Sequence, residues 1–148
     1  MTASGVTWIV VADGSGARVF EERVRLGPLT ERFEMAAESH ENRHRASAHG
    51  ATVTSRVGPG RHGAGTDDPA SRAEERFLTT YASRIDAAAE QGAFEHLVLI
   101  APPQALGVLR GHLKAATTRR IEASDPHERL HETLESIQSR LQAVRAKT

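Results

Sequence analysis

Two runs of consecutive apolar residues stand out in an otherwise polar chain. The first covers residues 7–12 (TWIVVA) and is rich in β-branched side chains, and the second covers residues 97–101 (LVLIA). Short runs of this kind are typical of strands that are covered on both faces of a sheet. Pro102 and Pro103 follow the second run, and proline suits the first turn of a helix, where its missing N–H has no intrahelical partner. The stretch 94–113 therefore predicts a central strand that leads directly into a helix.

Shorter alternating patterns follow the first apolar run. Residues 17–24 and 29–35 alternate between apolar and polar side chains, and turn residues at 13–16 and 27–28 separate the segments. Alternation with a period of two is typical of strands, and an Asp-Gly pair is a strong hairpin signal. The pattern predicts an antiparallel meander of three strands, in which residues 21–23 become progressively exposed. The side chains expected to point inward are Val19, Phe20, Phe33 and Met35.

Helical periodicity occupies two segments in the second half of the chain. The first predicted helix covers residues 69–91, with Asp68 as its N-cap and Pro69 in its first turn. The second covers residues 102–114. Apolar residues at helical spacing predict one buried stripe on each helix. The stripes are Phe77, Tyr81, Ile85 and Ala88 in the first helix and Leu106, Leu109 and Leu113 in the second.

A third predicted helix covers residues 126–145 and follows a polar edge strand at 117–123. Asp125 and Glu128 have the spacing of a capping box. The apolar residues of the helix recur at heptad-like intervals. Packing into the chain's own core is the favoured interpretation of this stripe, and the alternative is a dimer through the last helix, so both monomer and dimer stay open. The stripe consists of Leu130, Leu134, Ile137, Leu141 and Val144.

Taken together, the elements predict the order β-β-β-α-β-α-β-α in a single α/β domain over residues 1–148. An antiparallel meander whose first strand neighbours parallel strands, reached through right-handed helical crossovers, is the ribonuclease-H-like topology. We therefore expect a three-layer fold with a mixed five-stranded sheet. The chain has 148 residues, which is enough for one such domain.

Composition excludes several classes of site. The chain has 19 acidic and 19 basic residues and no cysteine, which excludes disulfides, thiolate metal sites and a cysteine nucleophile. The charge balance means that a nucleic-acid partner would need a local basic patch. No stretch approaches the roughly 20 apolar residues that span a bilayer, and the N-terminus lacks the positive region of a signal peptide. The sequence predicts a cytoplasmic protein with no membrane span and no cofactor.

Residues 37–66 form a long predicted loop with little apolar mass. No acidic residue occurs from position 43 to position 66, and several glycines would let the backbone approach a phosphate backbone or another polyanion. A solvated loop without a ligand is the alternative. Three histidines are weak metal candidates, but no carboxylate or cysteine completes their set, so solvated histidines are favoured and no metal is predicted. The polyanion candidates are Arg43, Arg45, Arg56 and Arg61, and the histidines are His40, His44 and His49.

The ends of the predicted parallel strands are the second candidate site, because α/β folds commonly bind ligands there. Asp13 is the sharpest catalytic candidate, but two-metal catalysis needs several converging carboxylates. A second acid would be expected at the tip of the strand at 97–101, but that place holds Ala101, Pro102 and Pro103, although Glu74, Glu75 or Asp125 could contribute. The alternative is that Asp13 hydrogen-bonds its own turn. Ser15 and Ser55 lack the context of a catalytic serine, so no catalytic residue is predicted. The strand-tip candidates are Asp13, Ser15, Pro102, Pro103 and Asp125.

Four pieces of the chain resemble the bacterial host attachment protein family, whose members are described as required for attachment to host cells. They are TWIVVADGSGARVFE at 7–21, Gly-Pro-Gly-Arg at 58–61, AEERF at 73–77 and FEHLVLIAPPQALGVLR at 94–110. The last is the most specific, and the resemblance extends from residue 7 to about residue 141. The chain departs from the family pattern after the last strand, where an Asp-Leu-Thr is replaced by Ser124-Asp125-Pro126, and in its histidine-rich stretch at 40–56.

The resemblance implies a fold similar to the middle domain of archaeal and eukaryotic peptide-chain release factors, and hence an ancestral connection with ribosomes. The Gly-Gly-Gln of those factors is missing from this chain, which argues against peptidyl-tRNA hydrolysis. The leading hypothesis is a non-enzymatic binding or adaptor protein with an unidentified protein partner. The alternative is a factor associated with RNA or the ribosome, and a metal-dependent nuclease is the least favoured interpretation.

Overall fold

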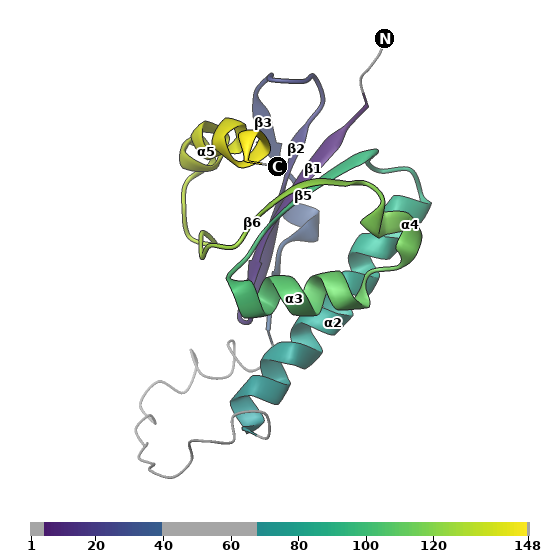
Figure 1. Ribbon diagram of the computed structural model, residues 1–148, viewed down its shortest axis with the longest axis vertical. Helices are drawn as coiled ribbons and strands as arrows, with labels where there is room; N and C mark the ends of the chain where they lie inside the picture. Colours follow the sequence, from purple (N-terminus) through teal and green to yellow (C-terminus); the bar gives the residue numbers. More distant parts are fainter. Residues whose placement is uncertain (1–4, 40–67, 148) are drawn as a thin grey trace.

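The computed structural model describes residues 5–39 and 68–147, which form a mixed α/β structure (Figure 1). Its strands are β1 (Thr7–Asp13), β2 (Gly16–Glu22), β3 (Leu29–Glu31), β4 (Ala37–Glu38), β5 (His96–Ile100) and β6 (Ile121–Asp125). Its helices are α2 (Pro69–Glu90), α3 (Pro103–His112), the single turn α4 (Ala115–Thr118) and α5 (Leu134–Ala146), with a 3-10 turn, η1, at Phe33–Met35.

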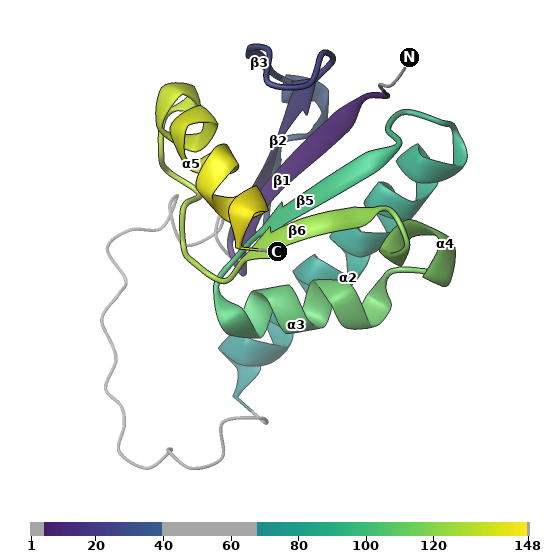
Figure 2. The same cartoon turned by 45° about the horizontal axis from the view of Figure 1, so that its top comes forward.

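The strands form one mixed sheet in the order β3-β2-β1-β5-β6, with the two-residue β4 also paired to β2. β2 is antiparallel to β1, β3 and β4, whereas β5 is parallel to both β1 and β6 (Figure 2). The mixed sheet predicted from the sequence is confirmed, but it has six strands in the described residues where five were expected. The ribonuclease-H-like assignment stays a prediction.

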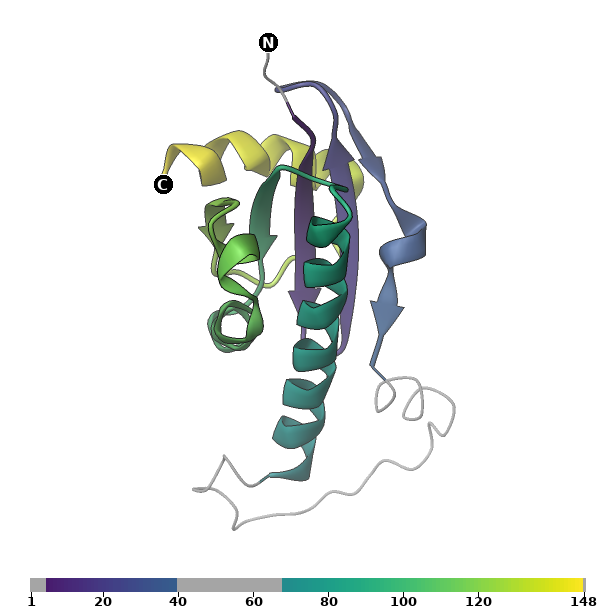
Figure 3. The ribbon, with the colours of Figure 1, turned by 90° about the vertical axis from the view of Figure 1, so that its right-hand side faces the viewer.

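Helices cover both faces of the sheet. α2 and α3 lie on one face and α5 lies on the other (Figure 3). Side chains alternate along a strand. Trp8 and Val10 of β1 therefore lie in the core on one face, and Ile9 and Val11 lie in the core on the other. Both faces are therefore apolar, which explains the uninterrupted apolar runs of β1 and β5.

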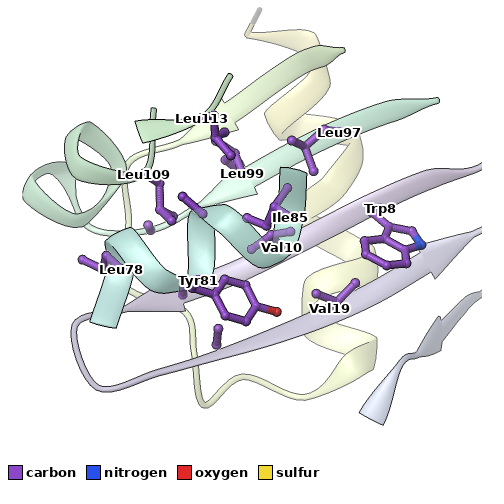
Figure 4. Packing of buried hydrophobic residues seen from close by; sticks show 14 of the residues in the cluster. Trp8, Val10, Val19, Leu78, Tyr81, Ile85, Leu97, Leu99, Leu109 and Leu113 are labelled. Carbon is purple, nitrogen blue, oxygen red and sulfur yellow. The ribbon is translucent and has the colours of Figure 1, made fainter. Parts of the chain in front are cut away.

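The larger core lies between the sheet and α2 and α3 (Figure 4). Tyr81 and Ile85 of α2 are at most 1% exposed, as the helical stripe predicted, whereas Phe77 is only partly buried. The Tyr81 hydroxyl donates to the carbonyl of Met35 at 2.7 Å, so the aromatic side chain fills the core and also satisfies its polar atom. This bond ties α2 to the segment between β3 and β4.

The third strand is shorter than the alternating pattern predicted. β3 ends at Glu31, and the chain then makes the 3-10 turn at Phe33–Met35. A 3-10 turn replaces the period of two by a period of about three, so Met35 is buried as expected but Phe33 is 73% exposed. The prediction that Phe33 points inward is wrong.

Two glutamates of β2 are buried where increasing exposure was predicted. Glu21 is 5% exposed and Glu22 is 2% exposed. Arg32 donates to Glu21 at 2.8 Å, and Arg145 forms two hydrogen bonds with Glu22 at 2.6 and 3.0 Å. Buried carboxylates are tolerated when cations and hydrogen bonds compensate them, and both arginines come from elsewhere in the chain.

The C-terminal third differs most from the sequence prediction. The predicted strand at 117–123 is replaced by the turn α4 and by β6, which does lie at the sheet edge. The predicted capping box at Asp125 is wrong, because Asp125 ends β6 and α5 begins only at Leu134. The N-cap of α5 is Thr133, whose hydroxyl accepts the Ser136 N–H at 3.1 Å.

The apolar stripe of α5 packs on the sheet. Ile137, Leu141 and Val144 lie in the core formed with Phe20 and Ile100, as the favoured interpretation of the heptad-like spacing predicted. A dimer through this stripe would have to expose these core residues. Within residues 5–39 and 68–147, no helix combines the length and the apolar character needed to cross a bilayer.

Candidate binding site at the carboxyl edge of the sheet

The carboxyl ends of the parallel strands β1, β5 and β6 meet at one edge of the sheet, which we call the carboxyl edge. Asp13 ends β1 and Asp125 ends β6. Ala101, which follows β5, donates its N–H to the carbonyl of Asp125 at 3.1 Å. Pro102 and Pro103 lead from this point into α3. The fold thus brings the predicted strand-tip residues to the same edge, as parallel strands require.

Asp13 organises the two-residue turn between β1 and β2. Its Oδ1 accepts the Ser15 N–H at 2.7 Å, the Ser15 hydroxyl at 2.8 Å and the Gly16 N–H at 3.1 Å. An aspartate that bonds the backbone two and three residues ahead is typical of a turn. The structural role proposed for Asp13 as the alternative to catalysis is therefore confirmed.

Glycines let other elements approach this turn closely. A Cβ atom at Gly14 would lie only 2.6 Å from Cγ of Glu74 in α2, and one at Gly16 would lie 3.2 Å from Cδ2 of Leu130. Both distances are shorter than ordinary contacts, so a side chain at either position would displace its neighbour. The turn is consequently covered by α2 on one side and by residues 126–133, the loop between β6 and α5, on the other.

Glu128 of this loop forms a carboxyl pair with Asp13. Its side chain hydrogen-bonds the Asp13 carboxylate, and its Oε2 also lies 3.3 Å from the N–H of Leu130. Partial burial, together with the hydrogen bond to Asp13 and the negative charge there, raises the pKa of the Glu128 carboxyl. A hydrogen bond between two carboxyl groups requires one proton, and Asp13 already acts as an acceptor in its turn. Below its raised pKa, the Glu128 carboxyl carries that proton.

We expect Glu128→Gln to stabilise the protein at neutral pH. Because the pKa of Glu128 is raised in the folded state, its contribution is present below its unfolded pKa of about 4.5 and is lost as pH rises. Glutamine cannot ionise and still offers a donor to Asp13. The gain at pH 7 should stay below about 1 kcal/mol, because Glu128 is exposed to solvent.

Thermal melts at pH 4 and pH 7 measure this effect. The variant should melt above the parent protein at pH 7, and the difference should vanish towards pH 4. Glu75→Gln, an exposed glutamate of α2, is the control and should show no such pH dependence. A Glu128→Gln variant that is no more stable than the parent at pH 7 would contradict the carboxyl pair.

Asp125 is the most enclosed acid of the carboxyl edge, with 3% exposure. His127 Nδ1 lies 2.6 Å from its Oδ1, and Arg129 Nε donates to its Oδ2 at 2.7 Å. Burial alone would raise the pKa of Asp125, but the hydrogen bonds from Arg129 and His127 outweigh burial and lower it. The ionised carboxylate of Asp125 thus holds the start of the 126–133 loop in place.

Arg18 fixes the other end of the same loop. Its Nη1 donates to the carbonyls of Leu130 and Glu132, both at 2.7 Å. Its Nε and Nη2 form a bidentate pair with Glu31 at 2.9 and 3.0 Å. Such a fork holds the guanidinium rigidly, so the loop is fastened at both ends, by Asp125 and by Arg18.

A groove of about 650 Å³ lies between the anchored loop and the hairpin of β1 and β2. Its floor consists of small side chains, and its rim carries polar ones. A volume of this size suits a small molecule or several residues of a partner. The lining residues are Ser15, Gly16, Ala17, Arg18, Ala36, Ala37, Glu38, Leu130 and His131.

The arrangement resembles parts of two catalytic sites without assembling either. Asp125 and His127 form the acid–imidazole half of a triad, but the Ser15 hydroxyl donates to Asp13. Among the residues that the structure describes, no group of three or more histidines and carboxylates is placed to hold a metal ion. The bonds among these side chains hold a fixed surface around the groove.

The sequence prediction found part of this site. Asp13, Ser15 and Asp125 surround it, while the polyanion candidates Arg43, Arg45, Arg56 and Arg61 and the histidines His40, His44 and His49 lie outside the described residues. Sequence reasoning missed the residues that anchor and shape the 126–133 loop, because that segment was assigned to a helix. The alternating Asp-x-His-x-Arg directly after an edge strand is a signal that could have revealed them. The missed residues are Arg18, His127, Glu128, Arg129, Leu130 and His131.

Comparison with known sequences supports the resemblance noted in the sequence. The profile of the family described as "Protein required for attachment to host cells" matches residues 8–141. The match spans β1 to α5 and therefore includes the whole carboxyl edge. A search of curated proteins found no match. The chain belongs to the family of proteins required for attachment to host cells.

Proposed function

We propose that this protein is a non-enzymatic adaptor that binds another protein through the groove at the carboxyl edge. The observation that carries the proposal is that the acids of this edge are committed to bonds within the chain. Asp13 holds its own turn and lies against the Glu128 carboxyl, while Asp125 pairs with Arg129 and hydrogen-bonds His127. Side chains held in this way form a fixed surface, and their carboxylates already have partners within the chain.

The shape and composition of the groove support a protein partner. Its small floor residues, Gly16, Ala17 and Ala37, leave room for a partner's side chain beside the apolar Leu130. Protein interfaces combine an apolar centre of this kind with a polar rim, which Ser15 and the other rim residues supply. The family description concerns attachment to host cells, and an adaptor in the cytoplasm would affect attachment indirectly.

An RNA or ribosome partner is the alternative, and the acid-free sequence from position 43 to position 66 favours it. The release-factor-like fold that the family resemblance implies would point in the same direction. Binding to RNA depends steeply on salt because counterions are released, and it is abolished when the RNA is digested. A protein partner bound in the groove should show neither behaviour, so the two functions can be separated in one experiment.

Affinity capture from lysate of the source cells tests the proposal. The full chain should retain the same protein partner before and after nuclease treatment and at raised salt. Ala36→Trp, which places a large ring at the rim of the groove, should abolish retention. Ala87→Trp is the matched control, because Ala87 is exposed on α2 and is not part of the groove. Retention of ribosomal material that nuclease removes would overturn the proposal in favour of the RNA alternative.

A further inference from the structure

The turn between β2 and β3 holds apolar side chains in solvent at the end of the sheet opposite the carboxyl edge (Figure 1). Val24 and Leu26 are each 67% exposed. Leu26 has φ of 67°, and it is the one residue other than glycine with positive φ among the described residues. The left-handed region disfavours leucine because Cβ crowds the following carbonyl. The backbone at Leu26 is therefore strained, and the apolar side chain of Leu26 is nevertheless exposed to solvent.

The surroundings of Leu26 explain why the strain persists. Its N–H donates to Oε2 of Glu22 at 3.1 Å, and Gly27 N–H donates to the carbonyl of Val24 at 2.7 Å. Glu22 is itself held by Arg145 of α5. The turn is therefore fixed to α5 through a buried ion pair. Strained residues that neighbouring structure enforces in this way are concentrated at functional sites.

A groove of about 410 Å³ lies directly beside the turn. Leu26 and Gly27 form one wall, and polar residues of α5 form the other. The Gln138 side chain accepts the N–H of Leu29 at 3.2 Å, which fixes the spacing between turn and helix. The groove is therefore preformed. Its α5 wall consists of Glu135, Gln138, Ser139 and Gln142, and its floor of Glu22, Leu141 and Arg145.

The charges of the turn and of the α5 wall have opposite signs. Arg23 and Arg25 flank Val24 on the turn, and their side chains are 75% and 52% exposed, although Arg23 also pairs with Glu21 at 3.3 Å and Arg25 with Glu122 at 2.9 Å. Glu135 is exposed on the α5 wall. An apolar turn with two exposed arginines thus lies next to a groove whose polar α5 wall carries one glutamate. Because Leu26 forms both the projecting side chain and one wall, projection and groove adjoin, which is the arrangement that a two-fold axis requires.

We propose that a second copy of this chain docks on this surface, with Leu26 of each copy entering the groove of the other. In this symmetric contact the arginines of one turn face Glu135 of the other copy. The surface is small, so the association is expected to be weak and reversible. It is separate from the stripe of α5, which stays buried in the core of each copy.

Sedimentation equilibrium of the full chain over a range of concentrations tests the proposal. The parent protein should show a reversible monomer–dimer equilibrium. Leu26→Asn should weaken association at least tenfold, since it removes the apolar side chain. At a concentration where both proteins are monomeric, the same variant should melt about 2 °C higher, because asparagine tolerates the left-handed region. Phe33→Ser, which removes an equally exposed apolar side chain from η1, is the control and should leave association unchanged.

A groove-filling variant provides an independent measurement. Ser139→Tyr should weaken self-association and leave Leu26 intact. A mixture of Leu26→Asn and Ser139→Tyr should associate more strongly than either variant alone, because one productive contact is restored. A parent protein that is monomeric at every concentration would overturn the proposal. So would a Leu26→Asn variant that associates as strongly as the parent, or a Phe33→Ser variant that loses association equally.

Discussion

Replacing Arg145 by methionine is expected to lower the free energy of unfolding by about 3–5 kcal/mol at pH 7, because it leaves a buried carboxylate without its cation. Glu22 is 2% exposed, and Arg145 supplies two hydrogen bonds to it at 2.6 and 3.0 Å. Arg145 also donates to Glu122 at 2.8 Å. The change therefore loosens α5 from β2 and from β6. Urea denaturation at pH 7 measures the effect.

The pH dependence of this variant gives a second readout. In the parent protein, burial alone would raise the pKa of Glu22, but the hydrogen bonds and charge of Arg145 lower it. Its contribution to stability is thus present above pH 4.5 and is lost as the pH falls through the folded pKa. Without Arg145 the sign reverses, because protonation relieves the unpaired charge. The deficit of Arg145→Met should therefore shrink from pH 7 to pH 4.

Two controls make the Arg145 prediction specific. Arg140→Met removes an arginine of the same helix whose side chain is 45% exposed and which pairs with Glu132, and this change should cost less than about 1 kcal/mol. Adding Glu22→Gln to Arg145→Met should recover part of the loss, because no buried charge remains. An Arg145→Met variant that loses no more stability than Arg140→Met would contradict the buried ion pair.

Replacing Arg129 by alanine is the second large effect, with an expected loss of about 2–3 kcal/mol at pH 8. Arg129 donates to the buried Asp125 at 2.7 Å and to Glu132 at 3.2 Å. His127 then remains as a hydrogen-bond partner of Asp125. Burial raises the pKa of Asp125 but Arg129 and His127 lower it, so the loss should be smaller at pH 4, where carboxylates begin to protonate, than at pH 8.

Chemical denaturation at pH 8 and pH 4 tests this prediction. His127→Ala should cost less than Arg129→Ala at pH 8, because Arg129 continues to neutralise Asp125. The side chain of His127 is also 54% exposed, whereas that of Arg129 is 15% exposed. Equal losses for the two variants, or a loss that is the same at both pH values, would show that Asp125 is not held as described.

The sequence predicted those parts of the fold that local pattern determines. β1 and β5 follow from apolar runs, and α2 follows from a helical stripe that starts after Asp68 and Pro69. These elements bury side chains whose periodicity is visible within a single segment. Because Asp13 and Asp125 both follow predicted strands, the sequence pattern also indicated that they lie at one edge of the sheet.

Long-range partners account for most of what the sequence did not predict. Glu22 is buried because Arg145, far along the chain, reaches it. Arg129 and His127 occupy the Asp125 carboxylate, so Asp125 anchors a loop and does not cap a helix. Phe33 is exposed because the chain turns after β3. None of these outcomes is encoded in the period of a single segment.

We propose that the groove beside the carboxyl edge binds a protein partner. The most direct test of this proposal is the recovery of captured protein with Ala36→Trp relative to Ala87→Trp, after nuclease treatment. If the account is correct, the groove variant recovers at most a tenth of what the control recovers, since a lost anchor contact is worth about 1.4 kcal/mol or more. Equal recovery by the two variants would contradict it.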